Sequence, residues 1–121
     1  MKYLIVDDEP ATRKSLGWFL EQNGHSCKTA CNSVEAMSHL GHEIFDVVIT
    51  DLKMGRMNGL CLLKTIKERL PDIIVIIITG YGEEQIYAEA MSCGAKAFLK
   101  KPLNISKLNM ILNFAEPEIG Q

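Results

Sequence analysis

Five short apolar segments alternate with longer amphipathic stretches, and this alternation restricts the fold more than any other feature of the chain. The apolar segments have the length and aliphatic content of β-strands, at residues 3–6, 25–30, 45–50, 73–79 and 97–100. The other stretches show the apolar spacing of helices, at residues 9–22, 32–41, 60–70, 83–92 and 105–115. Strand–helix units in series indicate a parallel sheet sandwiched by helices, and right-handed crossovers leave few topologies. The predicted fold class is α/β, with a doubly wound five-stranded parallel sheet and helices on both faces.

Local signals support several of these elements. Pro10 stands in the first turn of the first helix, where its missing N–H costs nothing. Asn32 followed by Glu35 resembles a capping box at the start of the second helix. Residues 73–79 are apolar almost without interruption, which is typical of a strand covered on both faces.

Composition indicates a folded domain that does not bind nucleic acid through bulk charge. Apolar residues make up 47% of the 121 residues, and 13 basic against 15 acidic side chains give a net charge of −2. The longest aliphatic run, residues 73–78, is far shorter than the ~20 residues that span a bilayer. The apolar opening runs directly into Asp7, unlike a signal peptide. We therefore expect a single cytoplasmic domain over residues 1–121, without a membrane partner, ordered over about 2–115 and with an unstructured tail at 116–121.

The cysteines do not indicate a metal site or a disulfide framework. The four cysteines are Cys27, Cys31, Cys61 and Cys93. They form no CxxC pair, and the chain has no second pair of ligands at the spacing that a zinc site needs. We expect reduced thiols that pack as small hydrophobic side chains.

Polar side chains follow the predicted strands at the points where the strands end. Asp7 and Asp8 follow the first strand, and Asp51 follows the third. Thr79 closes the fourth strand, and Lys101 follows the fifth. Because the carboxyl ends of parallel strands meet at one edge of the sheet, where such folds bind ligands, these residues are expected to form one site.

This set of residues suits phosphoryl chemistry. Neighbouring carboxylates repel one another unless a cation is bound, and Mg²⁺ prefers oxygen ligands of this kind. An aspartate at a strand end can act as a nucleophile, as carboxylates do in aspartyl-phosphate chemistry. Lys101 and Thr79 could then neutralise and hydrogen-bond the transferred phosphoryl group.

The order and surroundings of these residues resemble the receiver domain of two-component response regulators. Asp7, Asp51, Thr79 and Lys101 are separated by 44, 28 and 22 positions. Similar blocks surround them, at residues 4–9, 51–54 with 57–59, 79–82, and 94–95 leading to 101–102. The resemblance covers about residues 2–115 and implies strand order 2-1-3-4-5. It also implies a non-enzymatic signalling domain that catalyses only its own phosphorylation and dephosphorylation.

The resemblance implies a role for each matching position. Asp51 would accept a phosphoryl group from a phosphohistidine on a sensor histidine kinase or a phosphotransfer protein. Asp8 and Asp51 would ligate the cofactor Mg²⁺ through their side chains, Lys53 through its backbone carbonyl, and Asp7 through a water molecule.

The resemblance also implies a switch. Lys101 would pair with the acyl phosphate, Thr79 would turn its hydroxyl toward it, and Phe98 would be the switch aromatic. The face formed by the fourth helix, fifth strand and fifth helix would then change shape. The Lys101–Pro102 bond is expected to be cis, which only proline permits at low cost.

Four positions near the anchors need separate comment. Lys100 and Lys101 are adjacent, and the residue directly before the proline, Lys101, matches the family motif. Gly55 stands where the family often has proline, which would loosen the loop that carries the Lys53 carbonyl. Lys53 and Tyr81 are candidates for tuning the lifetime of the phosphoryl group, and a solvated loop lysine is an equal alternative for Lys53.

Three other functions are weaker alternatives. A nucleotide- or flavin-binding sheet would carry a glycine-rich loop after the first strand, where this chain is acidic. An aspartyl phosphatase would need a general acid close to its nucleophile, and no carboxylate closely follows Asp51. A degenerate receiver that serves only as an interaction module would lack one of the matched site residues, and all of them are present. The sequence leaves open whether an effector domain follows and whether the chain forms a homodimer. It also leaves open which kinase recognises the surface of the first helix around Thr12, Lys14 and Ser15.

Overall fold

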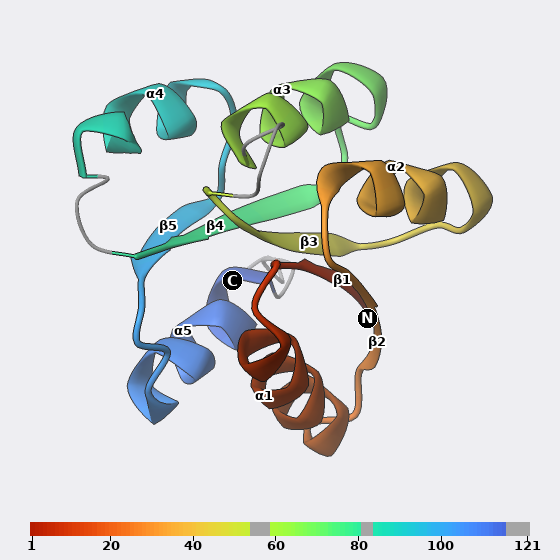
Figure 1. Cartoon of the computed structure of the whole chain (residues 1–121), viewed down its shortest axis with the longest axis vertical. Coiled ribbons are helices and arrows are strands. Elements are labelled where there is room, and N and C mark those ends of the chain that lie inside the picture. Colours follow the sequence, from red (N-terminus) through yellow and green to blue (C-terminus); the bar gives the residue numbers. More distant parts are fainter. Residues whose placement is uncertain (54–58, 81–83, 116–121) are drawn as a thin grey trace, which may run out of the picture.

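The predicted fold class is confirmed by the computed structural model, which describes residues 1–53, 59–80 and 84–115. Five parallel strands form one sheet in the order β2-β1-β3-β4-β5 (Figure 1). The strands are β1 Lys2–Val6, β2 Ser26–Ala30, β3 Val47–Asp51, β4 Ile74–Thr79 and β5 Ala97–Lys100. The α-helices are α1 Pro10–Gln22, α2 Ser33–His42, α3 Gly59–Arg69, α4 Tyr87–Ser92 and α5 Ile105–Ala115.

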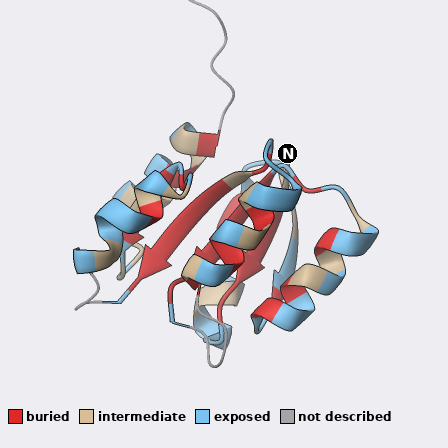
Figure 2. Ribbon diagram, turned by 90° about the horizontal axis from the view of Figure 1, so that it is seen from above, coloured by how far each residue is buried: buried red, intermediate tan, exposed pale blue. Residues whose placement is uncertain are grey.

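The helices cover both faces of the sheet, so the core has two layers. Helices α1 and α5 lie on one face, and α2, α3 and α4 lie on the other (Figure 1). Successive strand residues point to opposite faces, so Tyr3 and Ile5 pack with α1 and α5 while Leu4 and Val6 pack in the other layer. Figure 2 shows the buried strands lying between helices whose outer sides are exposed. The faces of β3 and β4 are therefore covered, and ligands can approach these strands at their ends.

Strands β3 and β4 are buried on both faces, and for β4 the nearly unbroken apolar run at residues 73–79 predicted this. Every residue of β3 is buried, and so is every residue of β4 except Ile74. Strand β3 starts two residues later than expected and extends to Asp51, so this aspartate is the last residue of the strand. Its backbone is therefore held by the sheet.

The helix signals are confirmed with one change. Pro10 is the first residue of α1, and Asn32 caps α2 by accepting a hydrogen bond from the Glu35 N–H at 2.8 Å. The return bond of a capping box would join the Glu35 carboxylate to the Asn32 N–H, but the carboxylate accepts from the Cys31 N–H instead, at 3.2 Å. Gly24 ends α1 with a φ of +86°, which glycine adopts without strain.

Two sequence-based expectations need correction, and others concern residues outside the described ranges. The helix expected over residues 83–92 starts as a 3-10 turn, η1 Glu84–Ile86, and becomes α-helical only at Tyr87, because tight first turns are common at helix N-termini. All four cysteines are outside disulfides, as expected, but Cys31 and Cys61 are exposed rather than packed. The expectations for the tail and for two loop positions, Gly55 and Tyr81, fall outside the described residues. Within the described ranges, no helix is both long and apolar enough to span a bilayer.

Candidate functional site

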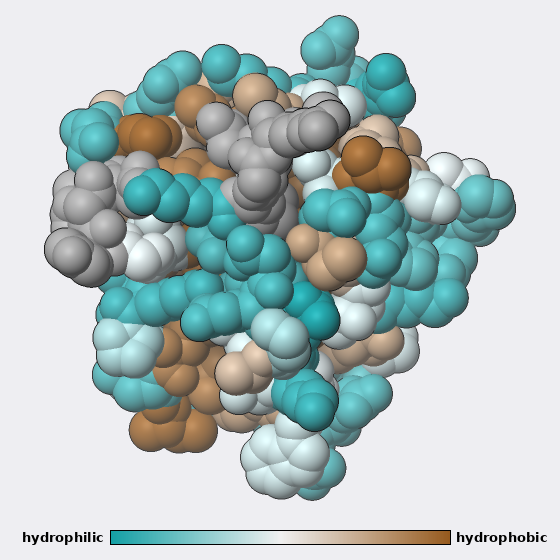
Figure 3. Space-filling view, viewed as in Figure 1, coloured by the Kyte–Doolittle hydropathy of each residue, from teal (hydrophilic) through white to brown (hydrophobic). Residues whose placement is uncertain are grey.

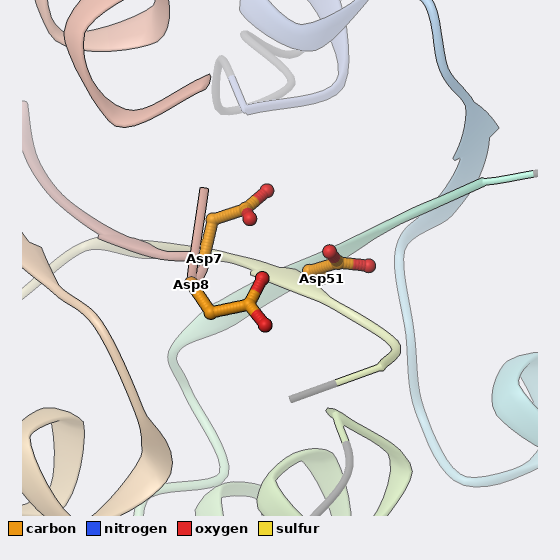
Figure 4. A group of neighbouring side chains, drawn as sticks. All are labelled: Asp7, Asp8 and Asp51. Atoms are coloured by element: carbon orange, nitrogen blue, oxygen red, sulfur yellow. The ribbon is translucent and has the colours of Figure 1, made fainter. Parts of the chain in front are cut away.

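Three aspartates converge at the carboxyl edge of the sheet, as the sequence predicted. Asp7 and Asp8 follow β1, and Asp51 ends β3 beside it. One carboxylate oxygen from each lies within 4.8 Å of the others, and Figure 4 shows the three groups beside one another. Asp7 and Asp51 are buried, and Asp8 is exposed. The cluster therefore has two fixed members and one that faces water.

Lys101 is the cation in contact with this cluster. Its Nζ lies 2.9 Å from Asp7 Oδ2 and 3.2 Å from Asp51 Oδ2. Its backbone N–H donates to the Thr79 carbonyl at 2.7 Å, which continues the pairing of β5 with β4. The adjacent Lys100 is exposed, and its backbone carbonyl accepts a hydrogen bond from the Lys107 ammonium. Of the two adjacent lysines, Lys101 is thus the one that lies against the carboxylates.

Burial and charge set the protonation of these groups. Burial raises the pKa of Asp7, and this effect outweighs the hydrogen bond from the Glu9 N–H and the nearby Lys101 ammonium. Burial by itself lowers the pKa of Lys101, but the hydrogen bond to Glu9, the close contact with the Asp7 carboxylate and the charge of Asp51 raise it overall. Lys101 is therefore a permanent cation at physiological pH.

The aspartates form a fitting donor set for a hard divalent cation. All three offer carboxylate oxygens, the ligands that Mg²⁺ prefers, and two oxygens on one Mg²⁺ lie at most about 4.2 Å apart. The 4.8 Å spread of the cluster is within a small side-chain rotation of that separation. Asp7 Oδ2 is buried and has no hydrogen bond of good geometry within the described part of the chain, since its contact with Lys101 is an ion pair only. A buried carboxylate oxygen in this situation favours a bound cation or water.

Residues 53 and 79 lie at the same edge. The Lys53 N–H donates to Asp51 Oδ1 at 3.3 Å, so the chain bends around the carboxylate directly after β3. Thr79 is buried at the end of β4, and its hydroxyl donates to the Gly80 carbonyl at 3.1 Å. The resemblance implies that the Thr79 hydroxyl donates to a phosphoryl group, and in this structure its proton is used in the hydrogen bond to Gly80 instead.

Phe98 lies on β5, behind the site and against α4. Its half-buried ring packs edge-to-face on Tyr87, with ring centroids 5.5 Å apart and planes at 84°. The Lys101–Pro102 peptide bond that follows is cis. The aromatic pair therefore joins β5 to α4, close in sequence to the lysine of the site.

Gly59 is required by the backbone of the site. A Cβ atom at this position would lie 2.2 Å from the Asp51 carbonyl oxygen and 2.9 Å from Leu52 Cα. The Gly59 N–H also donates to the Leu52 carbonyl at 2.7 Å. The first residue of α3 thus packs directly on the strand end that carries Asp51, at a distance that only glycine permits.

Two further residues of the site were not predicted from the sequence. Glu9 Oε1 accepts hydrogen bonds from Lys101 Nζ and from Thr12 Oγ1, both at 2.9 Å. Arg13 donates from Nη1 to the Asp7 carbonyl at 2.7 Å. Glu9 directly follows Asp8 at the same sheet edge, and this position is the signal in the sequence, although the residue also begins the first predicted helix. Arg13 follows one helical turn later.

A cavity of about 510 Å³ opens beside Lys101, between the start of α1 and the loop after β5. Its polar lining includes Glu9, Thr12, Ser15 and Lys101. In the view of Figure 3 a hydrophilic band crosses the middle of the molecule, between α1 and α5 on one side and α3 and α4 on the other. Lys101 and Glu9 are thus reachable from solvent on this side of the site.

Known proteins are similar to this chain in both sequence and fold. The family described as response regulator receiver domain matches residues 3–113. A putative NtrX-like response regulator from Rickettsia bellii is 38% identical over 93% of this chain and 24% of its own length. A response regulator receiver domain protein from Clostridium thermocellum has a TM-score of 0.86 at 35% identity, covering 94% of this chain and 92% of that one.

A third relative was solved with a modified residue and bound groups. It is a response regulator protein from Burkholderia pseudomallei with a phosphorylated aspartic acid, a calcium ion and citrate, with a TM-score of 0.85 at 30% identity. The alignment covers 95% of this chain and 66% of that one. The chain spans about a quarter of the length of the first curated relatives that it matches. The match over residues 3–113 and the shared fold show that this chain belongs to the response regulator receiver domain family.

Proposed function

We propose that this chain is the phosphoacceptor switch of a two-component phosphorelay and that Asp51 is the residue that becomes phosphorylated. The observation that carries this proposal is the contact of Lys101 Nζ with Asp51 Oδ2 at 3.2 Å, inside a cluster of three carboxylates. Asp51 combines a backbone held in the sheet with a side chain that is 10% exposed, so an incoming group can reach it. The relative from Burkholderia pseudomallei carries a phosphorylated aspartic acid, which supports an aspartate as the acceptor.

The reaction we propose is in-line transfer of a phosphoryl group. A carboxylate oxygen of Asp51 forms a bond to phosphorus while the phosphorus–nitrogen bond of a phosphohistidine breaks, and the imidazole nitrogen keeps that electron pair. Lys101 is already placed beside Asp51 Oδ2, and it donates to an oxygen of the transferred group. The reaction modifies Asp51 of the chain itself and hydrolyses no phosphate ester of an outside substrate. The chain therefore acts as a signalling domain.

Mg²⁺ is the cofactor that this donor set fits. Asp8 and Asp51 would hold it through their carboxylates, Asp7 through a water molecule, and Lys53 through its backbone carbonyl. When bound, Mg²⁺ supplies positive charge beside the phosphoryl oxygens. The buried Asp7 oxygen that lacks a well-aligned hydrogen bond supports a water or cation at this point.

The output we propose is a change in the face formed by α4, β5 and α5. Thr79 leaves the Gly80 carbonyl and donates to the phosphoryl group, and Phe98 moves into the space that Thr79 vacates. Shifting such a switch from about 1% to 99% active requires about 5.5 kcal/mol. A hydrogen bond to a charged group contributes about 1.5–3 kcal/mol, so about two to four such bonds to the phosphoryl group provide this free energy.

The partners follow from this chemistry. The phosphodonor is a sensor histidine kinase or a phosphotransfer protein that docks beside Lys101, where Thr12 and Ser15 line a cavity. Residues 1–121 form one receiver domain that acts in the cytoplasm, and its changed face meets an effector domain, another protein or a second copy. The domain itself makes no contact with nucleic acid or membrane, in keeping with the net charge of −2.

Labelling with a small phosphodonor tests the proposal. The wild-type chain is incubated with acetyl phosphate and MgCl₂, and phosphorylation is followed by intact-protein mass spectrometry. Asp51→Asn should abolish labelling, while Asp72→Asn, which changes an exposed aspartate outside the carboxylate cluster, should be labelled like the wild type. Labelling that needs MgCl₂ and stops in EDTA is expected. Undiminished labelling of Asp51→Asn would refute the assignment of the acceptor.

A further inference from the structure

Glu9 occupies the N-cap position of α1 but does not cap the helix. Its backbone is extended, with φ −88° and ψ 112°, and its side chain makes no hydrogen bond to the N–H groups of the first turn. N-cap positions usually carry short side chains such as serine or aspartate for that purpose. The Glu9 carboxylate instead accepts hydrogen bonds from Lys101 Nζ and Thr12 Oγ1. The Glu9 side chain therefore reaches Lys101 and is held by the Thr12 hydroxyl, and it leaves the N–H groups of the helix uncapped.

Lys101 is already surrounded by carboxylates. Its Nζ lies 2.9 Å from Asp7 Oδ2, 2.9 Å from Glu9 Oε1 and 3.2 Å from Asp51 Oδ2. Two of the three N–H groups of the Lys101 ammonium donate hydrogen bonds, to Glu9 Oε1 and Asp51 Oδ2, and Asp7 is held beside it as an ion pair. A phosphoryl oxygen that arrives on Asp51 therefore competes with these oxygens for the ammonium.

The three carboxylates differ in how easily they can leave. The Asp7 side chain is completely buried, and its Oδ1 also accepts the Glu9 N–H at 2.9 Å. Asp51 is 10% exposed and is itself the acceptor. The Glu9 side chain is 60% exposed, so it can rotate into water and be solvated there. Glu9 is thus the contact that is released at least cost.

We infer that Glu9 is a positioning residue that holds Lys101 while Asp51 is unmodified and competes with the phosphoryl group for its ammonium. Thr12 keeps the Glu9 carboxylate in place through its hydroxyl. The inference rests on the proposed function, because it assumes that a phosphoryl group binds at Asp51. Loss of the Glu9 contact should make the site more receptive to such a group, at the expense of the resting position of Lys101.

Beryllium fluoride, which binds carboxylates as a phosphoryl analogue, measures this competition. The full chain is titrated with it at saturating MgCl₂, and bound fluoride is followed by ¹⁹F NMR. Glu9→Gln is expected to bind about two- to fivefold more tightly than the wild type, the size of effect typical of one exposed ion pair. Thr12→Val keeps every charge and should shift the affinity in the same direction by less. Glu21→Gln removes the same charge from the far end of α1, about 18 Å along the helix, and should leave the affinity unchanged.

A second measurement reports on Lys101 directly. The ¹⁵Nζ resonance of Lys101, assigned by its loss in Lys101→Met, should shift in Glu9→Gln without beryllium fluoride and should not shift in Glu21→Gln. A thermal melt accompanies each variant, and only a small change is expected because Glu9 is exposed.

The outcomes separate the two proposals. Equal affinities for wild type and Glu9→Gln, equal gains in Glu9→Gln and Glu21→Gln, or no gain in Thr12→Val would each overturn the role of Glu9 while the proposed function stands. If the wild-type chain takes up no beryllium fluoride, the proposed function is wrong and the role of Glu9 is refuted with it.

Discussion

Lys101 places a positive charge against the buried carboxylates of Asp7 and Asp51, so its removal should destabilise the metal-free protein. Lys101→Met keeps an unbranched side chain of similar length and deletes the charge. The substitution leaves Asp7 and Asp51 beside each other, with side chains 0% and 10% exposed and without the ammonium that contacts both. Buried carboxylates without a cation are costly, because the surroundings screen their charges poorly.

The size of the effect follows from the burial of the partners. Removing one partner of a fully buried ion pair costs about 3–5 kcal/mol. The Lys101 side chain is 20% exposed and the site is open to water on one side, so solvent screening reduces this value. We expect a loss of about 2–3 kcal/mol, which at roughly 4 °C per kcal/mol lowers the melting temperature by about 8–12 °C.

Urea unfolding followed by circular dichroism, at neutral pH in EDTA, measures this loss. Lys100→Met is the matched control, because it deletes the same charge from the adjacent, exposed lysine, and it should cost at most about 0.5 kcal/mol. Millimolar MgCl₂ should recover part of the loss in Lys101→Met, since a cation bound by the carboxylates offsets their repulsion. Equal stability of the two methionine variants would refute the idea that Lys101 holds the cluster together.

Two further predictions concern the backbone of the site and the opposite edge of the sheet. Gly59→Ala would place a Cβ 2.2 Å from the Asp51 carbonyl, so thermal unfolding should show a loss of about 1–3 kcal/mol and acetyl phosphate labelling should slow; wild-type stability would contradict this. Hydrogen bonds from Lys2 and Lys28 lower the pKa of Glu43 from 4.5 to about 2, so their stabilisation is complete above pH 4.5 and is lost as the pH falls toward 2. The difference in urea midpoint between wild type and Glu43→Gln should therefore shrink over that interval, and a constant difference would argue against the linkage.

The contacts among the functional side chains were harder to predict than the elements that carry them. Glu9 and Lys101 are 92 positions apart, and their contact depends on where the start of α1 lies relative to the end of β5. The direction of the Thr79 hydroxyl, toward the Gly80 carbonyl, depends on one side-chain torsion. The close approach of Gly59 to the Asp51 carbonyl depends on how α3 packs against β3. None of these has a periodic signal in the sequence.

The sheet, its helices and the meeting of Asp7, Asp51 and Lys101 at one edge could be predicted from residue order, because hydrophobic periodicity specifies the elements and parallel strands bring their carboxyl ends together. The oxygens that surround the Lys101 ammonium, with Glu9 among them, depend on how the folded elements pack. Side-chain contacts of this kind form over about 3 Å, a scale set by the packing of elements and by rotamers, and residue order does not encode that scale locally.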